Sequence, residues 1–220
     1  MSAAVNDLVA LLGALAVFNV CLTASAIAIA LPIACLFAVG RLSRRLLVYY
    51  PVTAYVNVLR SSPLLMIMFW AYYTGPMITG APTSAYTAAL IALAAFEVAY
   101  FTELVRAGLQ SISSGQRDAA LAVGLRPSQA MRFVILPQAL RRMLPSLISQ
   151  SIIAFQDSTI ASVIGVSDIL AVTNIISARE QRPIELYTAV AAIFFVLCYG
   201  LSRLVRTLEA RVNARTAGAG

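Results

Sequence analysis

The chain has 220 residues, of which 60% are hydrophobic and only 11% are charged. A soluble domain carries about 25% charged residues, so this composition excludes an ordinary soluble protein and indicates an integral membrane protein. All 16 basic residues are arginines, and there are 9 acidic residues. Because lysine and histidine are both missing, the sequence excludes the phosphate-loop lysine of an ATPase and the usual histidine metal sites.

Five apolar stretches predict membrane crossings, since a bilayer core of about 30 Å needs roughly 20 helical residues. They are residues 18–40, 63–78, 86–105, 144–166 and 186–204. The residues before 18 are expected to lie at the outer surface or to extend the first helix. The prediction is therefore an all-α integral membrane protein with five transmembrane helices.

The arginines predict the orientation of these spans. Segments 41–60, 106–142 and 203–215 hold four, six and four arginines, whereas the opposite side holds only Arg179 and Arg182. Because arginine is retained on the cytoplasmic side, the N-terminus is predicted outside and the C-terminus inside. Arginines placed between apolar spans set topology, so no nucleic-acid partner is expected. Residues 1–212 are predicted to form one transmembrane domain, and residues 213–220 a short flexible tail.

The longest cytoplasmic segment is punctuated like a pair of short helices. Its punctuating residues are Ser113, Ser114, Asp118, Gly124, Pro127 and Pro137. The serines can cap a helix beginning at 115 or 116, and the aspartate favours its positive end. The glycine suits a left-handed C-terminal stop, and the first proline suits the start of a second helix. Pro137 is expected to mark a break before the chain re-enters the membrane. An ordinary cytoplasmic loop is the alternative.

The spacing of this segment resembles the EAA loop of bacterial ABC-importer permeases. The matching residues are Asp118 in the glutamate position, Ala119, Ala120, Gly124, Val134 in the isoleucine position, Ile135, Leu136 and Pro137. In that family the loop, here about 106–143, forms the coupling helix that docks in a cleft of the ATP-binding subunit. The resemblance implies that this contact is made here by Asp118, Ala119, Ala120, Gly124, Leu136 and Pro137.

The resemblance extends over residues 15–212 and implies more about the assembly. It implies the type I importer fold, a non-catalytic subunit of the bacterial inner membrane, and ATP and Mg bound by a partner ATPase dimer. A second permease subunit, identical or homologous, and a periplasmic binding protein are implied as further partners. No cofactor or metal is expected in this chain.

Polar residues inside the predicted spans are candidates for the substrate pathway. They are Glu97, Tyr100, Gln150, Gln156, Asp157 and Ser158. Glu97 is the most informative, since it lies about 16 Å into its span at 1.5 Å per residue, where an acid is costly. It either faces a pathway or is protonated or hydrogen-bonded and locks helices together. Glu103 and Arg106, three residues apart, are expected to form a structural ion pair.

Three short motifs resemble the glutamate/aspartate branch of the polar amino acid permeases. They are Arg60-Ser61-x-Pro63-Leu64, Phe96-Glu97-x-Ala99-Tyr100 and Phe155-Gln156-Asp157. The resemblance implies an acidic amino acid as cargo. An ionised Glu97 would repel such a cargo, so it would have to be protonated, paired with an arginine or turned away. Alternatives are glutamine, a basic amino acid or an opine as cargo, or an autonomous secondary transporter.

Overall fold

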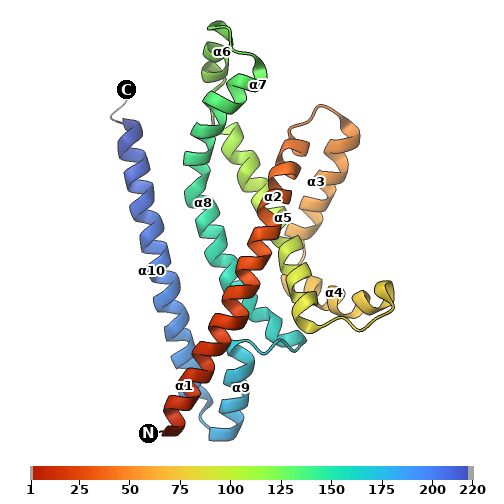
Figure 1. The fold of residues 1–220 in the computed structure, drawn as a ribbon, viewed down its shortest axis with the longest axis vertical. Helices are drawn as coiled ribbons and strands as arrows, with labels where there is room; N and C mark the ends of the chain where they lie inside the picture. Colours follow the sequence, from red (N-terminus) through yellow and green to blue (C-terminus); the bar gives the residue numbers. More distant parts are fainter. Residues whose placement is uncertain (1, 218–220) are drawn as a thin grey trace.

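The computed structural model describes the backbone of residues 2–217 and the side chains of residues 6–203 and 205–207. Every element within these residues is a helix. In chain order they are α1 (Ser2–Ala14), η1 (Leu15–Val20), α2 (Cys21–Arg41), α3 (Leu46–Ser61), α4 (Leu64–Thr79), α5 (Ala85–Gln110), α6 (Ser114–Ala122), α7 (Pro127–Ala130), η2 (Met131–Ile135), α8 (Leu136–Asp157), η3 (Ser158–Ile164), α9 (Ile169–Glu180) and α10 (Pro183–Ala217). Figure 1 shows long rods sharing one axis, with the two termini at opposite ends.

The predicted five-span architecture is confirmed. Four helical stretches are long and apolar enough to cross a membrane, namely Asn6–Arg41, Ala85–Gln110, Pro127–Ile164 and Pro183–Thr207. The fifth crossing is the bent pair α3 and α4, whose axes meet at 109°. The residues before 18 extend the first helix, through the π-helical turn η1.

The second crossing was predicted wrongly in its bounds. Residues 46–61, counted with the cytoplasmic segment, form α3, and α4 projects sideways from its lower end (Figure 1). The chain bends at Ser62 and Pro63, which are both extended, because a proline lacks an N–H and disfavours helix in the residue before it. Arg60 therefore lies at the end of α3 that is farther from the cytoplasmic loop. The predicted orientation survives, since segments 106–142 and 203–215 still hold six and four arginines.

The core is built around α5, which packs along α2. An alanine every fourth residue of α2 faces this contact, and each is fully buried: Ala26, Ala30, Ala34 and Ala38. They meet Val98, Phe101 and neighbouring residues of α5. Small side chains let two helix backbones approach closely in a membrane, so this stripe holds α5 in the centre of the bundle.

The fourth crossing begins earlier than predicted and contains no break at Pro137. Helix runs without interruption from Pro127 to Ile164. The wider π turn η2 lies just before the proline, and there the N–H of Leu136 donates to the carbonyl of Met131, five residues back. Proline cannot donate a helical hydrogen bond and crowds the preceding turn, which this wider turn accommodates.

The C-terminal helix is also longer than predicted. Helix α10 continues to Ala217, so residues 213–217, expected in a flexible tail, are helical. Residues 218–220 of that predicted tail lie outside the described residues.

Candidate functional site

Helices α6 and α7 form a compact hairpin at one end of the molecule, the upper end in Figure 1. Helix α6 ends in a Schellman motif, because the N–H of Leu125 donates to Ala120 O at 3.2 Å and the N–H of Gly124 donates to Leu121 O at 3.0 Å. Gly124 has a φ of +87°, the left-handed conformation predicted from the sequence. Ser113 precedes the helix as expected, but its hydroxyl makes no cap hydrogen bond.

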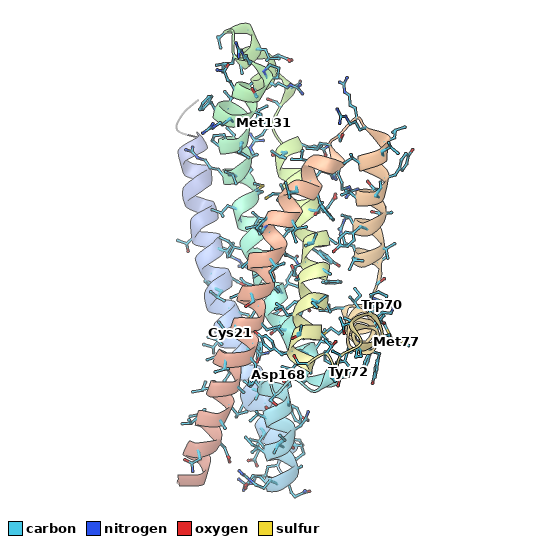
Figure 2. All side chains as sticks on the ribbon, turned by 45° about the vertical axis from the view of Figure 1, so that its right-hand side comes forward. Cys21, Trp70, Tyr72, Met77, Met131 and Asp168 are labelled. Atoms are coloured by element: carbon cyan, nitrogen blue, oxygen red, sulfur yellow. The ribbon has the colours of Figure 1, made fainter. Side chains whose placement is uncertain are left out.

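The second half of the hairpin is capped by a glutamine instead of a serine or aspartate. Pro127 occupies the first turn of α7, as the sequence predicted. The backbone N–H of Arg126 donates to Gln129 Oε1 at 2.9 Å, which closes the start of the helix. Met131 marks the base of the hairpin in Figure 2. The turn between the two short helices is therefore fixed by backbone–backbone hydrogen bonds at one end and by a side-chain cap at the other.

Helix α6 is exposed over most of its circumference. Asp118 and Ala119 are exposed, and Val123 at the end of the helix is 78% exposed. Ala120 differs from its neighbours, because it is buried within the hairpin and contributes to internal packing. The exposed surface of α6 carries small side chains and one acid, Asp118. A second surface could approach its backbone closely.

One polar contact joins the hairpin to α8, and a second joins the C-terminal end of α5 to α8. Gln138 Nε2 donates to Gln116 Oε1 at 3.2 Å, and an Arg142 guanidinium nitrogen donates to Ser111 O at 2.5 Å. Leu136 and Pro137, also predicted coupling residues, are exposed at the start of α8 next to this junction. The hairpin is thus tied to the long helix that enters the membrane.

The expected pair of Glu103 and Arg106 is part of a larger ion-pair cluster. Arg106 Nε donates to Glu103 Oε2 at 3.1 Å, and Arg41 of α2 also contacts this carboxylate. The sequence analysis missed Arg41, which lies 62 residues away in the chain. One carboxylate therefore connects α2 and α5 and leaves the cluster with an excess of positive charge.

Glu97 is turned into the protein and away from any open face. It is fully buried in α5, and Gln150 Nε2 of α8 donates to both of its carboxylate oxygens, at 3.3 and 3.2 Å. Gln150 is itself buried. Of the two alternatives for Glu97, this geometry is that of a group joining two helices.

Ser158 belongs to a second buried polar cluster. Asn19 Nδ2 donates to Ser158 Oγ at 3.0 Å and to Asp168 Oδ2 at 3.4 Å, and Asn19 Oδ1 accepts from the Ile169 N–H at 3.2 Å. All three side chains are at most 1% exposed, and Asp168 also caps α9 by accepting from Ala171 N–H. Asp168 lies near the lower third of the molecule (Figure 2). Sequence reasoning missed Asn19 and Asp168; the signal was an asparagine within the first apolar stretch.

The remaining pathway candidates lie along one face that no helix of this chain covers. We define the α5–α8 face by exposed or half-exposed residues at helical spacing, namely Tyr100, Leu104 and Ala107 of α5 and Arg142, Ser146, Ser149, Ile153 and Gln156 of α8. A hollow of about 220 Å³ between the two helices contains Leu104, Ala107, Arg142 and Ser146 in its lining. Asp157, half-buried, follows at the end of the α8 stripe. Polar side chains at this depth require a cavity or another protein surface.

Arg60 lies beside this face. Its guanidinium carbon is 5.3 Å from the centroid of the Tyr100 ring, in cation–π contact. The Tyr100 ring also packs against Phe96, with centroids 4.8 Å apart. The sequence analysis counted Arg60 with the cytoplasmic arginines and did not anticipate this contact. Among the residues that the structure describes, no three histidine, cysteine, aspartate or glutamate side chains cluster as a metal site requires.

Residues 9–214 match the family described as the binding-protein-dependent transport system inner membrane component. The chain belongs to this family. It is 36% identical over 197 residues to the glutamate/aspartate import permease protein GltK of Escherichia coli O6:H1, covering 86% of this chain and 88% of the relative. It is 37% identical over 159 residues to the probable glutamine ABC transporter permease protein GlnP of Bacillus subtilis, covering 71% and 72%.

Solved structures agree with the family. The crystal structure of an amino acid ABC transporter with histidines contains a chain of TM-score 0.88 and 33% identity, covering 95% of this chain and 97% of that one. The inward-facing MetNI methionine ABC transporter shares the fold, at a TM-score of 0.65 and 21% identity. This inner membrane component therefore has the fold of a type I ABC importer permease, and it is a multi-pass protein of the inner membrane.

Proposed function

We propose that this chain is the non-catalytic permease subunit of an ATP-driven importer of polar amino acids, with glutamate and aspartate as cargo. One observation carries the proposal: the chain matches a glutamate/aspartate import permease across 86% of its own length. Glutamine is the second candidate cargo, because glutamine permeases match at 35% and 37% identity over about 160 residues.

The partners follow from the surfaces left open. The exposed side of α6, with Asp118 and Ala119, is suited to the cleft of an ATP-binding subunit, and Gly124 holds the end of that helix. An ATPase dimer binds ATP and Mg, and this chain holds no cofactor. A periplasmic binding protein delivers the cargo, and no nucleic acid takes part. Residues 1–212 act as one transmembrane domain within the lipid bilayer.

The α5–α8 face is the proposed contact with a second permease subunit and the route of the cargo. Its serines and Gln156 would be poorly placed against lipid, whereas a partner helix or a water-filled pathway would satisfy them. Tyr100, Gln156 and Asp157 are the predicted pathway residues on this side. Glu97, Gln150 and Ser158 are assigned to helix packing, because each is buried within this chain.

The test is uptake by the assembled complex in proteoliposomes. ATP inside the vesicles should drive uptake without any ion gradient; uptake driven by a gradient alone would make the protein a secondary transporter and overturn the proposal. Titrating the purified binding protein with glutamate, aspartate, glutamine and arginine then decides the cargo. Tighter binding of glutamate and aspartate supports the acidic assignment, and a preference for glutamine selects the second candidate.

A further inference from the structure

An arginine without a carboxylate partner lies deep within the membrane-spanning body. Arg60 ends α3, one helical residue before the bend that starts α4. Its neighbour Tyr100 is the sixteenth residue of α5, so it lies about 22 Å from the Ala85 end of that helix and about 15 Å from the Gln110 end. The guanidinium over this ring therefore lies within the length of the membrane helix, beyond the turn that carries Glu103 and Arg106.

No described side chain forms an ion pair with Arg60, and Glu103 is the acid near enough to interact with it electrostatically. The ion pairs formed within the described residues involve Arg41, Arg106, Arg179 and Arg182, and none involves Arg60. Glu103, the acid on the same stretch of α5 as Tyr100, already contacts two other arginines. An unpaired arginine at membrane depth is unfavourable, and such residues usually line substrate or ion pathways.

The geometry selects the kind of anion that Arg60 can bind. A planar guanidinium presents its N–H groups as a rigid fork, which matches the two oxygens of a carboxylate. Arg60 is exposed, and its contact with Tyr100 places it beside the α5–α8 face. Lipid phosphates lie outside the hydrocarbon core, whereas Tyr100 lies within the predicted span 86–105. A carboxylate that travels through the protein is an anion of matching shape that can reach this position.

We propose that Arg60 binds the α-carboxylate of the transported amino acid, with Tyr100 holding the guanidinium in position. This inference rests on the proposed import of amino acids and deepens it, because it names the chemical group that the permease itself recognises. The α-carboxylate is common to acidic and neutral cargo. The site therefore selects amino acids as a class, and discrimination among side chains is left to other groups.

The experiment measures binding of a labelled amino acid to the detergent-solubilised transporter without its binding protein, using the amino acid that the wild-type complex imports. For glutamate, competitors are unlabelled glutamate and its α-carboxamide, isoglutamine. Wild type should bind glutamate at least tenfold more tightly than isoglutamine, which is about 1.4 kcal/mol. Arg60→Gln should bind glutamate at least tenfold more weakly and should lose the discrimination between acid and amide. Arg60→Lys should recover part of both effects, since it restores the charge without the planar fork.

Matched variants separate recognition from folding. Arg44→Gln removes another exposed arginine, outside α3, and should leave affinity and discrimination unchanged. Tyr100→Leu removes the ring beneath the guanidinium and should weaken binding. If wild type binds no amino acid, or if Arg60→Gln still prefers glutamate over isoglutamine tenfold, the inference is wrong. ATP-driven uptake by the wild-type complex would in either case leave the proposed function standing, while its absence would remove the proposed function itself.

Discussion

Gly124 offers a test of the coupling hairpin in which conformational strain is the only perturbation. A Cβ atom built on Gly124 meets nothing within 4 Å, so a larger residue is not excluded by contact. The left-handed φ of +87° costs an L-residue about 1–2 kcal/mol. Gly115, in the same short helix, also has open space around its Cβ position, and its φ is not left-handed. Alanine at the two positions therefore differs by the strain alone.

The expected order of variants follows from backbone preference. Gly115→Ala should match wild type or gain slightly, since alanine is the better helix former. Gly124→Asn should be mildly affected, because asparagine tolerates the left-handed region. Gly124→Ala should be worse, and Gly124→Val should be worst, since a β-branched residue is a true outlier there. A loss of 1–2 kcal/mol changes the local population of the ordered hairpin by about 5–30-fold.

The assay is the number of ATP molecules hydrolysed per amino acid imported by the reconstituted complex. This ratio should rise in the order Gly115→Ala, Gly124→Asn, Gly124→Ala, Gly124→Val, with all four proteins inserted and assembled normally. Normal insertion is expected because Gly124 follows the end of α6, and Figure 1 shows α6 at one end of the molecule. An unchanged ratio in Gly124→Val would refute the assignment of this hairpin to coupling.

Three further changes test the interior. Glu97→Gln keeps the shape and one oxygen that can accept from Gln150 Nε2, so uptake should stay within about twofold, and a loss of uptake at normal stability would instead place this residue in the pathway. Glu97→Leu should lower the melting temperature of the complex, because it leaves a buried amide unpaired at a cost of about 1–3 kcal/mol. Gly108→Ala puts a Cβ 2.8 Å from Met143 Cβ and should cost about 1–3 kcal/mol of stability. Met143→Ala cannot rescue this variant because alanine keeps the same Cβ atom, and Gly200→Ala serves as a neutral control because its Cβ would have open space. Equal melting temperatures for the two glycine variants would contradict the close approach. Asn19→Leu should lower the free energy of unfolding by about 1–3 kcal/mol, because it leaves a buried carboxylate and a buried N–H without this partner. A melting temperature equal to that of wild type would show that the cluster adds no stability.

Local signals accounted for what the sequence predicted well. The left-handed glycine at 124 and the proline at 127 act through their own backbone, so one residue is enough to predict each. The number of spans follows from long apolar runs. In contrast, residues 46–61, which the arginine pattern of segment 41–60 predicts to be cytoplasmic, form α3. Its membrane position depends on packing against α2 and α5, which no local pattern reports.

The buried polar clusters depend on contacts that are distant in the chain. Glu97 and Gln150 are 53 residues apart, and Asn19 lies 139 residues from Ser158. Each residue is visible in the sequence as a costly polar group in an apolar span, which is why Glu97, Gln150 and Ser158 were selected as candidates. Their partners, and therefore whether they face a pathway or lock helices, are decided by which helices pack together. Tyr100 and Gln156 differ from these three residues because they lie on the uncovered α5–α8 face.

The uninterrupted helix from Pro127 to Ile164 makes the hairpin and the face mechanically one piece. Gln156 lies 20 residues, or about 30 Å, beyond Leu136, so tilting this rod by about 10° at its cytoplasmic end displaces Gln156 by about 5 Å. Its length also sets an angular phase, because each inserted residue would turn everything beyond it by about 100°. One extra residue in α8 would swing the serines away from their face without altering a single side chain. The spacing between the two ends is thus as much a part of the machinery as the residues at either end.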